Sequence, residues 1–379
     1  MRILVLNCGS SSIKYRLFDG DDVAAEGIVE RIGEPGSEVA DHHAGLRSIM
    51  TQLAPFTGDG GLDAIGHRVV HGGEEFVEPA LIDTDVIERI RAQIPLAPLH
   101  NPANLMGIEV AFDLEPELPH VAVFDTAFHR TLPAHAFRYA IPEHAYRDHG
   151  VRRYGFHGTS HSYVASLAAD HLGRDLSEIG LITLHLGNGA SATAIRGGES
   201  VETSMGLSPL EGLVMGSRSG DLDPAIVFHL QRSAGMSAAE VETMLNRQSG
   251  LLGLSGDNDM REIGRRASDG DPVAQLAIDV YCHRIKKYVG AYLAVLGGAD
   301  AIVFTGGIGE NQADIRRRSL AGMERLGIAV DAERNAGADP GIGPAPIHAD
   351  ESRTEVLVIA TNEELEIANQ VRSLVAGSS

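Results

Sequence analysis

Two separate stretches of this chain repeat one pattern, and this repeat constrains the fold more than any other feature. The stretches are ILVLNCGSSSIKYRLFDG (3–20) and LITLHLGNGASATAIRGG (181–198). In each, an apolar run ends at a polar residue, Asn7 or His185, passes through a glycine-containing turn and returns as a second strand-like run. A strand pair that occurs twice in one chain predicts a duplicated domain.

A shorter similarity and the helical segments indicate what surrounds these strand pairs. HVAVFDTAF (120–128) is similar to DAIVFTGGI (300–308), and each is a β-branched run that stops at polar or glycine residues. Apolar residues at three-to-four spacing predict helices over 41–53, 161–172 and 271–298. Hairpins followed by alternating helices and strands are typical of α/β domains with mixed sheets. We therefore predict two such domains with a ligand-binding cleft between them.

Composition narrows the functions that such a chain can have. Its 379 residues exceed one ordinary core, and 43% hydrophobic with 22% charged residues is typical of a globular protein. The net charge of −21 argues against binding to nucleic acid or to an anionic membrane, both of which need a basic face. Cys8 and Cys282 form no CxxC pair, and no apolar run is long enough to span a bilayer. We expect a cytoplasmic, reduced enzyme.

The turn NCGSSSIK is suited to an anion, although it lacks the GxxxxGK[ST] spacing of a P-loop. A strand-to-strand turn exposes backbone N–H groups and the hydroxyls of Ser10 and Ser12, and Lys14 adds a positive charge. The alternative is an ordinary hairpin turn. The loop TGGIGEN (305–311) follows a buried strand, and its glycines would let a nucleotide approach the backbone closely.

Two arginines lie in glycine-flanked polar motifs. Arg68 occurs in GHRVVHGG and Arg218 in MGSRSGDLDP. A single arginine of this kind is commonly explained by a structural salt bridge. Two of them fit bidentate contacts to carboxylate or phosphate oxygens.

Histidines and carboxylates supply the remaining candidates. His157 and His161 in HGTSH have the spacing of a helical metal pair, but HExxH is absent, and we expect His161 to begin a helix capped by Ser160 or Thr159. Asp125, at the end of VAVFD, is the best-placed carboxylate for Mg²⁺ or a reacting group. Glu363 is the second candidate. Its alternative role is to stabilise a helix N-terminus, where Thr361 and Glu364 predict a capping box.

Taken together, the motifs resemble those of the acetate kinase family. They occur in the family's order between residues 7 and 363: NCGSSSIK, GHRVVHGG, PLHNP, VAVFDTAFH, YGFHGTSH, HLGNGAS, MGSRSGDLDP, SGLLG, TGGIGEN and TNEE. The resemblance implies a duplicated ribonuclease-H-like, actin-like ATPase fold with mixed sheets around a nucleotide cleft. It implies an N-terminal domain of 1–129 plus 366–379, and a C-terminal domain of 130–365 that binds nucleotide and forms the dimer contact.

The resemblance also implies a role for each matching residue. Catalytic groups would be Asp125, Arg68, Arg218 and His157, the last two stabilising the transferred phosphoryl group, with His100 in support. The acetate pocket would consist of Arg68, Val70, Leu99, Phe156 and Pro209, and Asn7 and Glu363 would bind the metal. ATP would contact Ser10, Ser12, Lys14, His185, Leu186, Gly187, Asn188, Gly189, Asp259, Met260, Arg261, Gly307, Ile308, Gly309, Glu310 and Asn311.

The activity implied is Mg²⁺-dependent phosphoryl transfer between ATP and acetate, giving ADP and acetyl phosphate, with Mn²⁺ as a substitute metal. Acetate is already a carboxylate at neutral pH, so it needs no general base, and we expect direct in-line transfer. The alternatives are a propionate or other short-chain fatty acid kinase and, in a different class, an actin- or Hsp70-like ATPase switch. The resemblance further implies a homodimer formed through the second domain, with the helix at 272–296 contributing.

Overall fold

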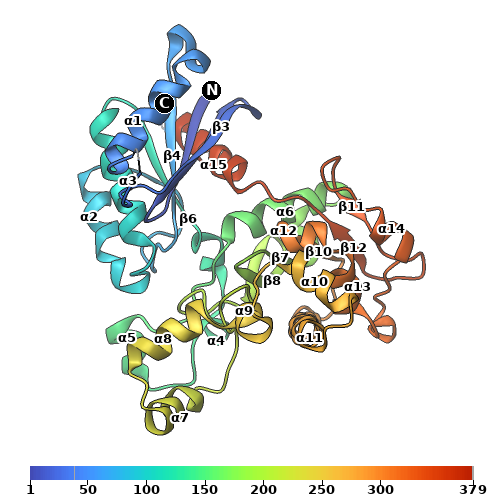
Figure 1. The fold of residues 1–379 in the computed structure, drawn as a ribbon. Helices are drawn as coiled ribbons and strands as arrows, with labels where there is room; N and C mark the ends of the chain where they lie inside the picture. The colour runs from blue at the N-terminus through green and yellow to red at the C-terminus, as the bar shows by residue number, and fades with distance from the viewer. Residues whose placement is uncertain (38, 378–379) are drawn as a thin grey trace. The chain divides into compact units, whose positions relative to one another are not determined.

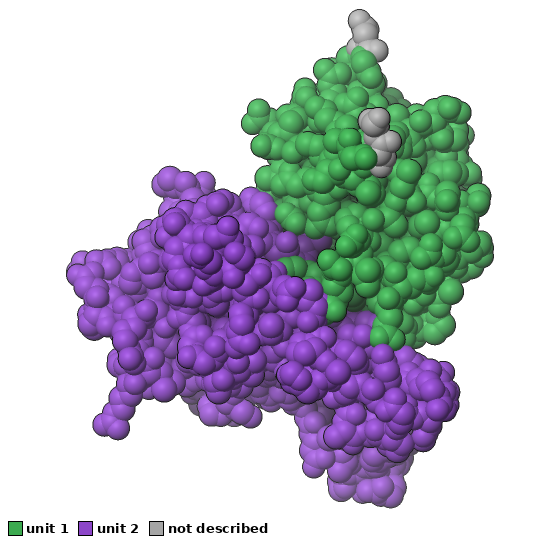
Figure 2. Space-filling view, turned by 180° about the vertical axis from the view of Figure 1, so that it is seen from behind, with its two compact units in different colours: residues 1–130, 362–379 green, residues 131–361 purple. Residues whose placement is uncertain are grey.

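The computed structural model describes residues 1–37 and 39–377, which form two compact units. Unit 1 is Met1–Arg130 with the segment from Asn362 onward, and unit 2 is Thr131–Thr361; Figure 2 colours them green and purple. The second chain crossing between units was predicted after residue 365. Asn362 and Glu363 are grouped with unit 1, and the predicted domain boundary stays a prediction.

Unit 1 is a six-stranded mixed sheet with helices on both faces. Its strands are β1 (Arg2–Cys8), β2 (Ser12–Asp19), β3 (Asp22–Glu30), β4 (Ala64–Val69), β5 (Ala80–Leu81) and β6 (His120–Phe124), in the order β3-β2-β1-β4-β6-β5. Its helices are α1 (His42–Thr57), α2 (Thr84–Ala92), α3 (Asn101–Leu114) and α15 (Glu363–Gly377). Strands β1, β4 and β6 are parallel to one another, so their carboxyl ends lie at one edge.

Alternation along β1 explains why helices cover both faces of this sheet. Leu4 and Leu6 are buried in the cluster that contains residues of α1 and α3, whereas Ile3 and Val5 pack with Ile367 and other residues of α15. Successive strand side chains point to opposite faces, so a strand buried on both sides reads as a continuous apolar run. Figure 1 shows α15, in red, beside the blue strands from the other end of the chain.

Unit 2 repeats this arrangement. Its strands are β7 (Gly180–Leu186), β8 (Ala190–Arg196), β9 (Glu199–Thr203), β10 (Ala301–Thr305), β11 (Ala345–Pro346) and β12 (Glu355–Val358), in the order β11-β12-β10-β7-β8-β9. Read from β9, this order and its parallel and antiparallel senses match those of unit 1 strand for strand. The predicted α/β fold with two similar units is confirmed.

The helices of unit 2 lie between and beyond these strands. They are α4 (Ala134–Phe137), α5 (Glu143–His149), α6 (Gly158–Leu172), α7 (Ala225–Ala234), α8 (Ala238–Arg247), α9 (Gly250–Ser255), α10 (Met260–Ser268), α11 (Pro272–Leu296), α12 (Gly306–Asn311), α13 (Ala313–Leu320) and α14 (Ala332–Ala336). The long helix α11 has the predicted limits: Asp271 accepts from the N–H groups of Val273 and Ala274, and Gly297 ends the helix in a left-handed conformation.

The second internal similarity was matched to the wrong strand. β10 is the neighbour of β7 as β4 is the neighbour of β1, so the counterpart of β6 (120–124) is β12 and not the strand at 301–305. Both β10 and β12 are short, β-branched and fully buried at their centres, and sequence alone does not distinguish them.

Three local predictions are also corrected. The motif at 305–311 is the strand end followed by helix α12 and not a flexible loop, because the Glu310 carboxylate accepts the Gly306 N–H at 2.9 Å and stabilises the helix start. Helix α6 begins at Gly158, without a side-chain cap from Thr159 or Ser160. Asn362, and not Thr361, caps α15: its Oδ1 accepts the Leu365 N–H at 3.1 Å, while Thr361 is hydrogen-bonded to Ser160.

No helix among the described residues is both long and apolar enough to cross a membrane.

Candidate active site

The first group of predicted site residues meets at the carboxyl edge of the unit 1 sheet. Asn7 is near the end of β1, Arg68 is near the end of β4, and Asp125 directly follows β6. Glu363 is the first residue of α15. Ligands of open α/β sheets commonly bind outside the carboxyl ends of the parallel strands, which is where these four side chains lie.

Arg68 is the centre of this group. Its Nε donates to Asp125 Oδ1 at 3.0 Å and its Nη2 to Asp125 Oδ2 at 2.5 Å, which is a two-point ion pair. Its Nη1 lies 3.4 Å from Asn7 Oδ1, and its Nε lies 3.9 Å from Glu363 Oε2. Asp125 is only 1% exposed, and Arg68 compensates its buried negative charge.

Burial and charge act in opposite directions on these groups. Burial alone would lower the pKa of Arg68, but the charges of Asp125 and Glu363 outweigh it and raise that pKa. Burial raises the pKa of Glu363 above its ordinary value, even though Arg68 attracts its negative charge. Glu363 is therefore a carboxylate whose ionised form lacks full compensation within the protein.

The hairpin turn at residues 9–12 closes beside this group. Gly9 N–H donates to the Ser12 carbonyl at 2.8 Å, and the predicted return strand is β2. Lys14 Nζ lies 2.5 Å from Glu364 Oε1, so its charge is already paired with the start of α15. Ser10 is exposed and Ser12 is half-buried, so neither residue is shielded completely from solvent.

The donor set in unit 1 fits Mg²⁺. Asp125 and Glu363 offer carboxylate oxygens and Asn7 an amide oxygen, which are the hard ligands that this ion prefers. With Arg68 they carry a net charge of −1, which favours a cation. Within 1–37 and 39–377 no three His, Cys, Asp or Glu side chains are grouped to hold a metal alone. Mg²⁺ is commonly held by one or two carboxylates plus the phosphates of a nucleotide.

His157 organises the second group, in unit 2. It precedes α6 in a left-handed conformation with φ of 58°, which is uncommon for a residue with a side chain and marks a constrained position. Its Nδ1 lies 2.9 Å from Ser191 Oγ. Its ring stacks on that of His185 with 4.3 Å between centroids, and His185 Nδ1 lies 2.8 Å from Ser160 Oγ.

Arg218 lies beside His157. A Cβ built on Gly189 would lie 3.3 Å from His157 Nε2 and 3.7 Å from Arg218 Nη1, so both groups approach one side of this glycine. Arg218 Nη1 donates to the Pro209 carbonyl at 3.0 Å. No carboxylate of the described chain is paired with Arg218, and burial lowers its pKa. It is a partly buried cation without a counter-charge, as expected of a group that receives an anion.

The predicted apolar residues divide between the two units. In unit 1, Val70 is 7% exposed and Leu99 is 53% exposed, and His100 directly precedes α3. In unit 2, Phe156 is buried next to His157, and Pro209 accepts the hydrogen bond from Arg218. Val70 is two residues from Arg68 in the sequence and Pro209 contacts Arg218, so one predicted pocket residue in each unit adjoins an arginine.

A cavity of about 660 Å³ in unit 2 lies at the carboxyl ends of β7 and β10. Eight predicted nucleotide contacts line it: Gly187, Asn188, Asp259, Met260, Arg261, Gly307, Ile308 and Asn311. At its rim, the hydrogen bonds from Arg261 lower the pKa of Asp259 to about 2.

Other predicted contacts do not line this cavity: His185, Leu186, Gly189, Gly309 and Glu310. Leu186 is fully buried, and the Glu310 carboxylate is occupied by the N–H groups of Gly306 and Thr361 at 2.9 and 3.1 Å. Two lining residues, Asn258 and Gln312, were missed, although each adjoins a predicted motif.

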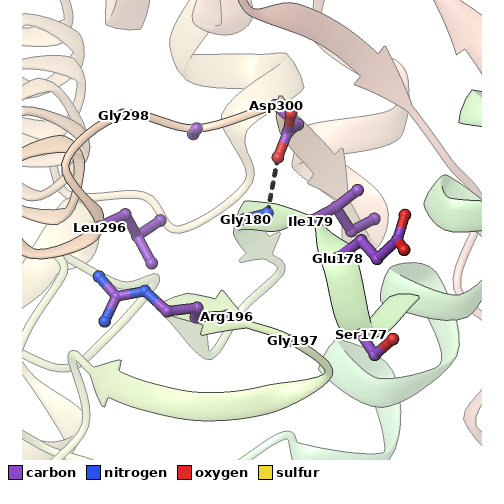
Figure 3. A pocket seen from close by; sticks show the side chains of 10 residues that line it. Ser177, Glu178, Ile179, Gly180, Arg196, Gly197, Leu296, Gly298 and Asp300 are labelled. Atoms are coloured by element: carbon purple, nitrogen blue, oxygen red, sulfur yellow. Dashed lines mark hydrogen bonds between the residues drawn. The ribbon is translucent and has the colours of Figure 1, made fainter. Parts of the chain in front are cut away.

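A second cavity of about 390 Å³ lies at the opposite, amino ends of the same strands (Figure 3). Gly180 begins β7, and its N–H donates to Asp300, which directly precedes β10, at 2.7 Å. Ligands of such sheets commonly bind at the carboxyl ends, so the cavity at the amino ends fits a nucleotide less well.

Sequence reasoning also missed the polar residues behind His157. Ser191, Thr183 and Ser160 are buried hydroxyls that contact its ring or those of the neighbouring histidines. Thr183 and Ser191 occupy strand positions, where a buried hydroxyl among apolar residues was the only available signal.

Comparison with known proteins gives one consistent result. The model of the acetokinase family matches residues 2–369. The chain is 56% identical to the acetate kinase of Streptomyces avermitilis, over 99% of this chain and 97% of that protein.

Solved structures agree with the sequence comparison. The crystal structure of Porphyromonas gingivalis acetate kinase superposes with a TM-score of 0.94 at 43% identity, covering 99% of both chains. A propionate kinase from Francisella tularensis superposes with a TM-score of 0.93, also at 43% identity, covering 98% of this chain and 99% of that one.

Proposed function

This chain belongs to the acetokinase family, and from that premise we propose that it catalyses reversible phosphoryl transfer between ATP and acetate, giving ADP and acetyl phosphate. The observation that carries the proposal is Arg218, a partly buried guanidinium without a carboxylate partner in the described chain, next to His157 Nε2. A site for two anions needs fixed positive charge and hydrogen-bond donors where the transferred group passes.

The chemistry asks for positioning and charge compensation. Acetate is ionised at neutral pH and needs no base, so the obstacle is repulsion between its carboxylate and the γ-phosphate. We assign Arg218 and His157 to the phosphoryl group in transfer, and Arg68 to the acetate carboxylate. Val70, Leu99, Phe156 and Pro209 would exclude water from the methyl group. The cavity lined by Asn188, Asp259 and Ile308 would take the nucleotide.

We assign Asn7, Asp125 and Glu363 to the metal, Mg²⁺ or Mn²⁺. When bound, the ion would neutralise phosphate charge, as in other phosphoryl transfers. Asp125 now has both oxygens on Arg68. Its share in metal binding would therefore come with a loosening of that pair.

A second acceptor, propionate, is supported by the propionate kinase that superposes on 98% of this chain. One additional methylene in an apolar pocket changes discrimination by only about 1–3 kcal/mol, or about 10–200-fold. We propose acetate as the preferred acceptor, with propionate as a poorer one.

Trapping with hydroxylamine tests the acceptor directly. ATP, Mg²⁺ and acetate should give acetohydroxamate, with a lower yield per unit time from propionate and the lowest from butyrate. Faster turnover of propionate than of acetate would replace the proposed function with its alternative. Hydrolysis of ATP that does not depend on either acid would favour an ATPase of the actin or Hsp70 type.

We also propose that the protein acts in the cytoplasm as a homodimer. Val273 and Leu276 of α11 are 47% and 59% exposed, which supports a contribution of this helix to the contact. Sedimentation of the purified protein would give the mass of the assembly.

A further inference from the structure

A continuous chain of hydrogen bonds leads from the interior of unit 2 to His157. Thr183 Oγ1 on β7 lies 2.7 Å from His161 Nδ1, and His161 Nε2 lies 2.8 Å from Ser191 Oγ on β8. The same Ser191 Oγ lies 2.9 Å from His157 Nδ1. Thr183, His161 and Ser191 are each 0% exposed, so these groups are shielded from bulk solvent.

Thr183, at the inner end of this series of hydrogen bonds, determines which atom donates in each of them. Among the described residues, Thr183 Oγ1 makes no hydrogen bond other than the one to His161. If Thr183 accepted a proton from His161 Nδ1, its own buried hydroxyl hydrogen would have no acceptor. A buried donor without a partner is costly, so the arrangement in which Thr183 donates is favoured.

The direction then passes along the chain. A neutral imidazole carries one N–H, so His161 accepts at Nδ1 and donates from Nε2 to Ser191. Ser191 uses its oxygen to accept from His161 and its hydrogen to donate to His157 Nδ1. His157 must then carry its own proton on Nε2, the atom that approaches Gly189 beside Arg218.

We propose that Thr183, His161 and Ser191 are positioning residues that fix the tautomer of His157, so that Nε2 is a hydrogen-bond donor. The hydrogen bond made at one imidazole nitrogen determines which of the two nitrogens is protonated. The catalytic meaning of this inference depends on the proposed function, because a donor is useful at Nε2 only if an anion is bound there. The tautomer itself does not depend on it.

The backbone supports the same conclusion. His157 is one of two described non-glycine residues with positive φ, and its ring also stacks on His185. A left-handed residue is retained where the surroundings fix its conformation. Ring position and tautomer are then set independently, the first by backbone and stacking, and the second by Ser191.

The first test is nitrogen NMR on the substrate-free protein labelled with ¹⁵N-histidine, at about pH 8, where an imidazole with an ordinary pKa near 6.5 is neutral. A His157→Gln variant assigns the signals. We expect the proton on Nε2 in both His157 and His161. A proton on Nδ1 of His157 would overturn the proposal, whatever reaction the protein catalyses.

The second test uses valine and serine at position 183. Thr183→Val keeps the shape of the side chain and removes the hydroxyl. The remaining hydrogen bonds between His161, Ser191 and His157 can then run in either donor direction. Thr183→Ser restores the donor. The matched control is Thr193→Val on β8, because Thr193 is equally buried and its hydroxyl contacts Thr203 at 2.9 Å and no histidine.

A wrong imidazole tautomer lowers kcat by about 10⁴-fold in a serine protease. In Thr183→Val, His157 would only lose its preference for one tautomer, so kcat should fall less, by about tenfold. We expect Thr183→Val to lower kcat by this amount with an unchanged KM for ATP, and Thr183→Ser to recover it. If Thr183→Val turned over like the Thr193→Val control, the proposal would be wrong. A parent protein that phosphorylates no acid would refute the proposed function but leave the NMR result standing.

Discussion

Arg68 and Arg218 differ in what surrounds them, although both were predicted to contact anions. Arg68 makes a two-point pair with Asp125 and lies near Glu363, whereas Arg218 contacts the Pro209 carbonyl and the Met215 sulfur. The first arginine is part of a charge network inside the protein. The second has no such partner in the described chain, so the two should differ in their effect on stability.

We expect Arg218→Ala to lower kcat by about 10³ or more, as arginines in phosphoryl transfer do, while the melting temperature changes little. Arg68→Ala should lower both, because it removes the two-point ion pair from the buried Asp125 carboxylate. Breaking a buried pair in this way costs up to about 3–5 kcal/mol, and partial exposure of Arg68 reduces that figure.

Steady-state kinetics and thermal melts of both variants check this prediction. Arg196→Ala is the control, because Arg196 is exposed and its Nη2 contacts only the Val295 carbonyl, at the amino end of the sheet. Near-normal turnover of Arg218→Ala would contradict the assignment.

Gly189 is a second residue whose substitution tests the site. A methyl group there would lie 3.3 Å from His157 Nε2 and 3.7 Å from Arg218 Nη1, in the space where a phosphoryl group would contact both donors. We expect Gly189→Ala to lower kcat more than about tenfold, as displacement by fractions of an ångström does at a positioned site.

Gly264→Ala in α10 is the matched control, since nothing outside its chain neighbours and the adjoining helix backbone lies within 4 Å of its Cβ position. The turnover of the two variants should be compared after thermal melts have shown that their melting temperatures are equal. Equal activity would show that the space next to Gly189 is not used.

Helix α15 begins with two adjacent glutamates whose pKa values are shifted in opposite directions. Burial raises the pKa of Glu363, whereas Glu364, although burial alone would raise its pKa, has it lowered by its hydrogen bond to Lys14. When folding raises the pKa of a carboxyl group, the folded state becomes less stable as pH rises from the group's unfolded-state pKa to its folded-state pKa. When folding lowers the pKa, the group stabilises the folded state at pH values above its unfolded-state pKa of about 4.3. This stabilisation is lost as pH falls through the folded-state pKa.

Glutamine at each position should therefore shift stability in opposite directions. At about pH 8, Glu363→Gln should melt higher than the parent protein and Glu364→Gln lower, and both differences should shrink as pH falls to about 4. Thermal melts across this range measure the effect, and each variant is the control for the other. Shifts of the same sign would contradict the charge balance described for this helix.

The elements that sequence predicted well are those with local signals. Asp271, Pro272 and Gly297 define both ends of α11 without reference to the rest of the molecule. Helix α12 was missed because three glycines in six residues disfavour a helix. What stabilises its start is Glu310, which also contacts Thr361, a residue distant in sequence.

For the whole molecule, the repeat predicted two α/β units, and the strand orders confirm it. Sequence did not identify which later strand corresponds to β6, because pairing is decided by neighbours in the sheet. The buried hydroxyls behind His157 were missed for the same reason. Thr183 and Ser191 resemble other strand residues until their partners on α6 are known.

Metal dependence belongs to the whole molecule as well. Because both oxygens of Asp125 are on Arg68, the proposed ion should bind chiefly with the nucleotide phosphates. A chelator should abolish phosphoryl transfer and leave the melting temperature unchanged, and added Mg²⁺ should restore activity. A clear fall in melting temperature would indicate a structural metal instead.

The most direct test of the account is the stereochemistry at phosphorus, measured with ATP that is chiral at the γ-phosphate through oxygen isotopes. Direct in-line transfer to acetate, with Arg218 and His157 stabilising the group in passage, predicts inversion of configuration in acetyl phosphate. Retention would mean two successive transfers through a phosphorylated residue of this chain, and would contradict the account.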